Sequence, residues 1–150
     1  MTARFHNPVD TRFGWGSLQE LVSITENQTV ALVTFPEARA LGLVDRLQAL
    51  LGDRLVYVIE DVQPNPDVAQ LRGTYERFWQ EAGDCHTVLA VGGGSAIDTA
   101  KALIVASNAS SSSKRPDSVP TINALAVSMA LPPPTAITVW QSPASCQKRS

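Results

Sequence analysis

The segment that decides the fold is VLAVGGGSAIDTAK, which runs from Val88 to Lys101. It opens with four apolar residues typical of a buried strand, continues with three glycines, and ends with residues typical of a helix. A helix that begins directly after such a turn presents free backbone N–H groups and the positive end of its dipole. Glycines lack side chains, so a phosphate group can approach those N–H groups closely. The segment therefore predicts a pyrophosphate-binding turn and a nucleotide cofactor.

Strand and helix patterns alternate on the N-terminal side of this turn. The predicted strands are Thr29–Phe35, Leu55–Ile59 and Thr87–Val91. The predicted helices begin at Pro36, after Pro64–Asp67 and at Ser95, and they end at Gly52, Gly83 and Val105. In the first helix, Leu41, Val44, Leu47 and Leu51 form one apolar stripe. Three strand–helix units with short connections predict an α/β fold with a Rossmann-like parallel sheet and flanking helices.

The glycine turn also has a purely structural interpretation. It matches neither the G-x-G-x-x-G fingerprint, because position 97 is Ile, nor a Walker loop, because no Gly-Lys-Ser/Thr follows at the required distance. Ser95 can cap the helix with Asp98 as its capping-box partner, and Lys101 can pair with Asp98 on the helix surface. The position of the turn at the carboxyl end of a strand favours a ligand. Both interpretations stay open on spacing alone.

Composition narrows the class of protein. The chain has 150 residues, of which 44% are apolar and 17% charged, as expected for one soluble globular domain. A net charge of -2 gives no reason to expect nucleic acid or a membrane as a partner. Two cysteines do not make a disulfide framework, and neither a secretory signal nor a bilayer-spanning stretch is recognisable. We therefore expect a cytoplasmic location.

The C-terminal segment, residues 107–150, differs from the rest of the chain. It holds six of the ten prolines and ten serines, whereas all nine glycines lie at or before Gly94. No sustained helical or alternating pattern is visible, and the run from Ser110 to Pro116 has the composition of a linker. The sequence thus predicts a domain at residues 1–106 and an irregular or disordered, low-complexity tail after it.

Several motifs together resemble the iron-containing, group III alcohol dehydrogenases. Val91–Lys101 (VGGGSAIDTAK) is similar to the family signature. Three other segments are similar to the family in order and spacing. The N-terminal strand and F-G-x-G turn correspond to Phe5–Val9 with Phe13–Leu18, the first nucleotide-contacting strand to Ala31–Thr34, and the P-N-P loop to Pro64–Pro66. The resemblance covers residues 5 to about 106, and its specificity comes from the combination.

The resemblance implies a dinucleotide-binding domain of an enzyme that interconverts alcohols and aldehydes or ketones with NAD or NADP. According to this resemblance, the pyrophosphate would be held by Gly93, Gly94 and Ser95. Asp98 would lie near the nicotinamide, and Asn65 would border the cofactor. The full set of cofactor-binding candidates is Thr34, Phe35, Asn65, Gly92, Gly93, Gly94, Ser95 and Asp98. The implied partners are the dinucleotide, a small alcohol or aldehyde and, through self-association of the N-terminal region, a second copy in a homodimer.

Two features depart from the family pattern. Many members have an Asp that binds the adenosine ribose where this chain has Phe35, so the choice between NAD and NADP stays open. The family continues into a helical domain whose one Asp and three His bind a divalent metal, iron or zinc, whereas this chain contains only His6 and His86. Residues 107–150 do not resemble family sequence, which suggests a truncated product or a tail read in another frame.

We therefore expect no catalytic residue and no metal ligand within this chain, and little or no turnover by the chain alone. Two alternatives stay open. The chain can be a non-catalytic nucleotide-binding module, or it can belong to a relative such as a glycerol dehydrogenase or a dehydroquinate-synthase-like lyase, which joins a similar glycine loop to a helical metal domain.

Overall fold

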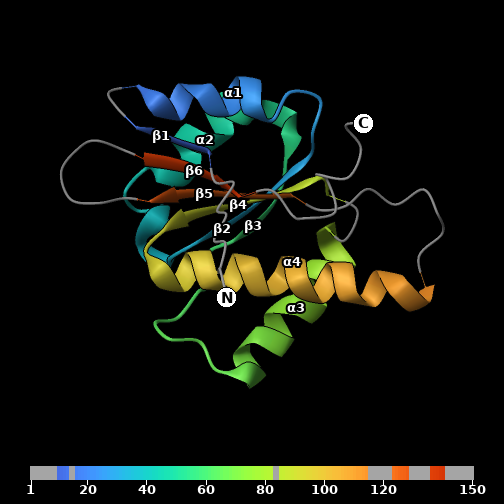
Figure 1. Ribbon diagram of the computed structural model, residues 1–150. Coiled ribbons are helices and arrows are strands. Elements are labelled where there is room, and N and C mark those ends of the chain that lie inside the picture. The colour runs from blue at the N-terminus through green and yellow to red at the C-terminus, as the bar shows by residue number, and fades with distance from the viewer. Residues whose placement is uncertain (1–9, 14–15, 83–84, 115–122, 129–135, 141–150) are drawn as a thin grey trace, which may run out of the picture.

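The part of the chain that the structure describes forms one six-stranded sheet with helices on both faces (Figure 1). The computed structural model describes residues 10–13, 16–82, 85–114, 123–128 and 136–140. The strands are β1 (Asp10–Phe13), β2 (Val30–Thr34), β3 (Leu55–Ile59), β4 (Thr87–Gly92), β5 (Asn123–Ser128) and β6 (Ala136–Trp140). They lie in the order β1-β6-β5-β4-β2-β3. β3, β2, β4 and β5 are parallel, while β6 and β1 add antiparallel pairings at one side.

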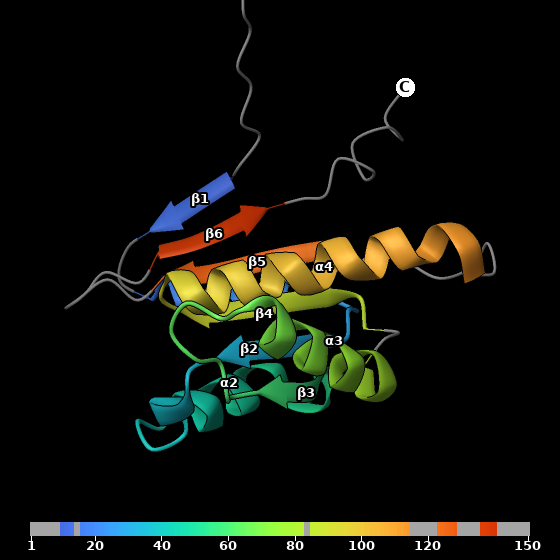
Figure 2. The ribbon, with the colours of Figure 1, turned by 90° about the horizontal axis from the view of Figure 1, so that it is seen from below.

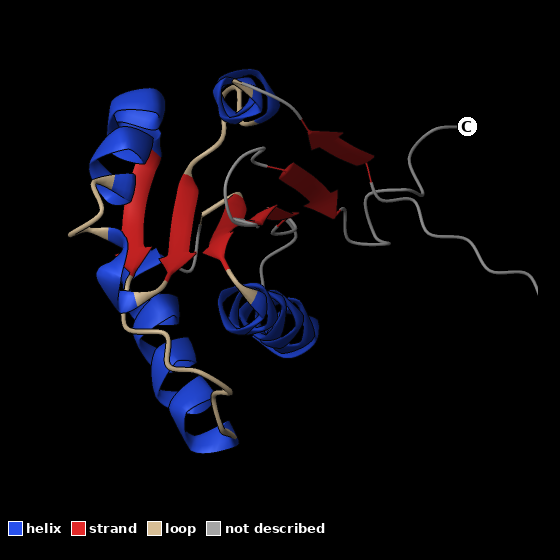
Figure 3. Ribbon diagram, turned by 90° about the vertical axis from the view of Figure 1, so that its left-hand side faces the viewer, coloured by secondary structure: helices blue, strands red, loops and turns tan. Residues whose placement is uncertain are grey.

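Helices cover the two faces of the sheet in separate layers. The α-helices are α1 (Leu21–Ile24), α2 (Leu43–Leu51), α3 (Val68–Ala82) and α4 (Gly94–Lys114), and the 3-10 helices are η1 (Ser17–Glu20), η2 (Pro36–Ala38) and η3 (Gly52–Arg54). α1 and α2 lie on one face, and α3 and α4 lie on the other (Figures 2 and 3). The predicted α/β class with a Rossmann-like parallel sheet is confirmed.

The two layers have separate hydrophobic clusters, and β2 contributes to both. Leu32 packs in the cluster under α1 and α2, together with Leu47. Its neighbour Val33 packs in the cluster under α3 and α4, together with Phe78. Successive side chains of a strand point to opposite faces, so a strand between two helical layers is apolar at every position. All five residues of β2 and all six of β4 are buried, as their near-continuous apolar sequences predict.

The first predicted helix is wrong at its start. The sequence predicts one helix from Pro36 with Leu41 in its apolar stripe, but the chain forms the short helix η2 and then begins α2 only at Leu43. Gly42 separates the two with a φ of 70°, a left-handed conformation that an α-helix cannot include. Leu41 consequently lies outside the core and is 69% exposed.

The irregular tail predicted from residue 107 is also corrected. α4 continues through Ser107 to Lys114, because no glycine or proline interrupts the sequence before Pro116. The segments 123–128 and 136–140 form β5 and β6 within the sheet. Alanine and serine have weak strand preferences, so pairing with β4 determines the conformation of β5, and composition does not reveal that pairing.

The parallel strands end at the same edge of the sheet. Thr34 of β2 is paired with Val91 of β4, and Gly92 is paired with Ser128 of β5. The residues that follow β2, β3 and β4 therefore meet at one edge, where ligands bind in open α/β sheets.

Several residues singled out in the sequence lie outside the described ranges. They are Phe5–Val9, Gly14, Trp15, Gly83 and one of the two cysteines, Cys146. Among the described helices, none is both long enough and apolar enough to cross a bilayer.

Candidate functional site

A cavity of about 430 Å³ lies at the carboxyl edge of the parallel strands. Three loops supply its walls: the segment after β2, the segment after β3 and the glycine turn after β4. The lining residues are Phe35, Pro36, Glu37, Val62, Gln63, Pro64, Gly93, Gly94, Ser95 and Ala96. The structure thus brings Phe35, Gly93, Gly94 and Ser95, four of the eight predicted site residues, to one cavity.

The three glycines of the turn differ in whether the surrounding structure would accept a side chain at their position. Gly92 has a φ of 147°, and a Cβ placed there would lie 3.1 Å from Cδ1 of Phe35 and 3.3 Å from Cβ of Ala96. The fold itself therefore requires glycine at this position. Gly93 and Gly94 are exposed, do not have positive φ, and a Cβ on either would meet nothing within 4 Å. At these two positions the bare backbone leaves open space above the start of α4.

α4 begins in the wall of the cavity. The carbonyl oxygen of Gly93 accepts a hydrogen bond from the N–H of Ile97 at 3.2 Å, which makes Gly93 the N-cap of the helix. Ser95 therefore lies within the first turn, and the capping box with Asp98 does not form, because that motif needs Ser95 itself at the N-cap. The first N–H groups of α4 have no acceptor within the helix, and they belong to residues that line the cavity.

Asn65 fixes the loop after β3 against the glycine turn. Its backbone N–H donates a hydrogen bond to Oγ of Ser95 at 3.2 Å. Asn65 has a φ of 50°, a left-handed conformation that asparagine tolerates better than most residues. The chain therefore turns at Asn65, within Pro64–Pro66. This loop forms one side of the cavity, which Pro64 lines.

Thr34 and Asp98 are near this cavity but do not line it. Thr34 is fully buried, and its hydroxyl donates a hydrogen bond to the carbonyl oxygen of Val91 at 2.8 Å, which ties the ends of β2 and β4 together. Asp98 lies one turn along α4, with its side chain 72% exposed, and pairs with Lys101 at 3.5 Å. This ion pair was predicted from the spacing of the two residues.

Sequence reasoning missed Glu37, which is the one charged residue among the described residues that line the cavity. Other acidic side chains near this edge have basic partners: Glu60 pairs with Arg39 at 2.9 Å, and Asp61 pairs with Arg77 at 2.7 Å. Hydrogen bonding to Asp61 and the negative charge of that carboxylate raise the pKa of Arg77. The available signal for Glu37 was its place two residues after the end of the predicted strand Thr29–Phe35.

A second cavity, of about 400 Å³, lies beside α3 and is lined by Arg77 and Asp61 among others. Thr99 also lines it, and Oγ1 of Thr99 is buried with no hydrogen-bond partner among the residues that the structure describes. This cavity does not include the glycine turn. The cofactor prediction therefore concerns only the cavity at the carboxyl edge.

The described residues contain no cluster of three or more His, Cys, Asp or Glu side chains that could hold a metal ion. His86, a described histidine, is in a structural contact: its Nδ1 lies 2.7 Å from Oγ1 of Thr29 at the start of β2. Cys85 beside it is buried.

Known proteins resemble this chain in sequence and in fold. Alcohol dehydrogenase 4 of Saccharomyces cerevisiae is 33% identical over 104 residues, which are 66% of this chain and 27% of that protein. The NADPH-dependent butanol dehydrogenase of Clostridium saccharobutylicum is 32% identical over 108 residues, 67% of this chain and 26% of that protein. The sulfoacetaldehyde reductase of Bifidobacterium kashiwanohense, solved in complex with NAD+, superposes with a TM-score of 0.65 at 28% identity.

That superposition covers 83% of this chain and 35% of the reductase. The chain therefore spans about a quarter to a third of the length of these relatives. The sequence model of iron-containing alcohol dehydrogenases matches residues 8–138, which extends past the boundary expected near residue 107. The chain belongs to the iron-containing alcohol dehydrogenase family.

Proposed function

We propose that the cavity at the carboxyl edge binds the pyrophosphate of NAD or NADP. The observation that carries this proposal is the open space at Gly93 and Gly94, where packing and backbone conformation would both accept a side chain. Bare backbone at these two positions lets phosphate oxygens reach the first N–H groups of α4, where the helix dipole favours negative charge. The residues present therefore fit a dinucleotide.

The proposal also gives a role to each of the other candidate residues. Ser95 offers its hydroxyl beside the pyrophosphate, and Asn65 keeps the neighbouring loop in place through its hydrogen bond to Ser95. Phe35 forms the wall next to the glycine turn, while Thr34 and Gly92 hold the ends of the two strands. Asp98, further along α4, borders the nicotinamide side. The NAD+ complex of the sulfoacetaldehyde reductase and the NADPH dependence of the butanol dehydrogenase support a dinucleotide of either kind.

The reaction that we propose for the whole enzyme is the interconversion of a small alcohol and its aldehyde or ketone. In that reaction a bound dinucleotide would supply or accept the hydride, and a bound divalent metal, iron or zinc, would polarise the substrate oxygen. Hydride transfer requires both reactants in one oriented site from which water is excluded. The family resemblance assigns one Asp and three His to the metal, and this sequence has two histidines. We therefore propose that this chain by itself binds the cofactor without turnover. We also propose that it is located in the cytoplasm, as a monomer or a homodimer.

The test is a titration of the full chain with NADH, followed by the fluorescence of the nicotinamide. We expect saturable binding, and we expect Gly93→Ala to weaken it at least tenfold, because the added methyl group occupies the space of the phosphate. Gly73→Ala is the matched control, since Gly73 in α3 also has nothing within 4 Å of an added Cβ but lies outside this cavity.

The outcomes separate the parts of the proposal. Failure of the full chain to bind both NADH and NADPH would overturn the cofactor function. Equal binding by Gly93→Ala and the unaltered chain would place the cofactor elsewhere. Oxidation of NADH by the chain alone, dependent on an added aldehyde and at ordinary enzyme rates, would overturn the claim that this chain lacks turnover.

A further inference from the structure

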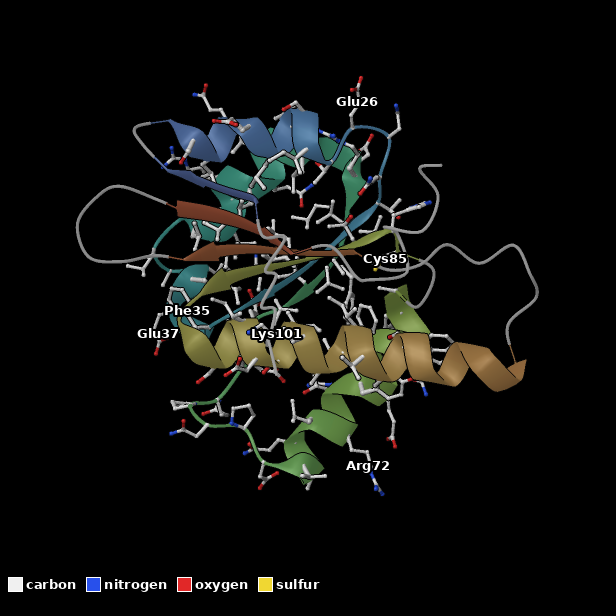
Figure 4. All side chains as sticks on the ribbon, viewed as in Figure 1. Glu26, Phe35, Glu37, Arg72, Cys85 and Lys101 are labelled. Carbon is white, nitrogen blue, oxygen red and sulfur yellow. The ribbon has the colours of Figure 1, made fainter. Side chains whose placement is uncertain are left out.

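Glu37 occupies a distinctive position in the cavity at the carboxyl edge. It belongs to η2, the short helix that directly follows β2, and β2 is the immediate neighbour of β4 in the sheet. Figure 4 shows Phe35 and Glu37 together at the end of α4 that begins at the glycine turn. Glu37 is exposed, and it is one of the residues that line the cavity.

The carboxylate of Glu37 has no partner among the described residues, in contrast to its acidic neighbours. Glu60, Asp61 and Asp98 each form an ion pair with a nearby base. Glu37 makes a backbone hydrogen bond, in which its carbonyl oxygen accepts the N–H of Leu41, but that bond leaves the side chain free. A ligand in the cavity therefore meets one uncompensated negative charge, and that charge is at the end of β2.

A dinucleotide whose pyrophosphate lies at Gly93 and Gly94 extends across the ends of the neighbouring strands. On the β2 side it meets Phe35, Pro36 and Glu37. The side chain of Phe35 has no group that accepts a hydrogen bond, and Pro36 has neither a polar side chain nor an N–H to donate. Of these three residues, Glu37 is therefore the one whose side chain can accept hydrogen bonds from the two ribose hydroxyls.

On this basis, which rests on the cofactor function proposed above, we propose that Glu37 binds the adenosine ribose and makes the site selective for NAD(H) over NADP(H). The 2′-phosphate of NADP would replace a hydrogen-bond donor with roughly two negative charges. Beside a carboxylate, those charges are repelled, and the hydroxyl-to-carboxylate hydrogen bond is lost.

Arg39 is the base closest to Glu37 in the sequence, and it does not offset this selectivity. Its Nε donates to both carboxylate oxygens of Glu60, at 3.2 and 2.9 Å. Arg39 is also outside the set of residues that line the cavity. The carboxylate of Glu60 already neutralises much of the charge of this guanidinium group, which weakens its attraction for a 2′-phosphate.

The experiment measures dissociation constants of NADH and NADPH for the full chain and for three variants by nicotinamide fluorescence. We expect the unaltered chain to bind NADH at least tenfold more tightly than NADPH. Glu37→Gln should weaken NADH binding roughly tenfold, the order of a hydrogen bond to a charged group. Glu37→Arg should reverse the preference. Glu26→Gln removes the same charge between α1 and β2, away from η2 and α4 in Figure 4, and should change neither constant.

Each result decides between the two proposals. If the unaltered chain binds neither dinucleotide, the proposed cofactor function fails, and the role of Glu37 fails with it. If it binds both equally, or prefers NADPH, or if Glu37→Gln and Glu26→Gln give the same constants, the cofactor function stands and the role of Glu37 is wrong. Circular dichroism of each variant verifies folding, which an exposed position should not alter.

Discussion

A methyl group should have opposite effects on stability at Gly92 and Gly94, which lie two residues apart in one turn. Gly92→Ala forces a left-handed φ on a residue with a Cβ and presses that atom against Phe35, so we expect a loss of about 1–3 kcal/mol. Gly94→Ala adds a better helix former to the first turn of α4, where nothing is in contact, and should gain about 0.5–1 kcal/mol.

Urea unfolding followed by circular dichroism measures both changes. If Gly94→Ala is stabilising and yet weakens NADH binding, glycine at this position serves a ligand and not the fold. A destabilised Gly94→Ala protein that binds NADH normally would show that glycine at this position serves the fold and not a ligand.

Individual residues of the site could be predicted from the sequence only where one segment carries the information. The glycine turn and the helix after it are continuous, so their arrangement follows from local sequence. Glu37 lies more than fifty residues before that turn, and it reaches the cavity because β2 is next to β4. Alternating strands and helices predict a parallel sheet, but they do not determine which strands are neighbours.

At the scale of helices and strands, local sequence also predicts some features correctly and misses others, and α2 allows a test. Leu47 of α2 is fully buried, whereas Leu41, which the sequence places in the same apolar stripe, is 69% exposed. We expect Leu47→Ala to cost about 2–5 kcal/mol of unfolding free energy, since it leaves a cavity in the core. Leu41→Ala should change stability by less than about 0.5 kcal/mol. Thermal and urea unfolding of the pair are the measurements, and equal losses would contradict the break at Gly42.

Periodicity placed Val44, Leu47 and Leu51 correctly in the core, but it wrongly added Leu41 and gave no sign of that break. A single glycine with a φ of 70° ends one helical segment and starts another, and the hydrophobic pattern continues across it. β3 and β4 were predicted nearly to the residue because their apolar runs are bounded by turn residues. β5 was missed because its conformation depends on pairing between distant segments.

At the scale of the whole molecule, residues beyond 107 take part in the sheet. β5 pairs with β4 along its whole length, from Thr87 opposite Asn123 to Gly92 opposite Ser128. Val127 of β5 is fully buried and belongs to the hydrophobic cluster under α1 and α2. β4, which carries the glycine turn, is therefore an interior strand only when β5 is present.

A chain that ends at residue 106 should consequently fold less well than the chain of 150 residues. It would lose the pairing along β4 and the buried Val127, expose an apolar strand edge and lose the C-terminal part of α4. We expect a lower unfolding temperature and a tendency to associate at micromolar concentration, measured by circular dichroism and light scattering. An unchanged unfolding temperature and a monomeric state would instead support the boundary that composition predicts near Ser107, with the segment beyond it dispensable for the fold.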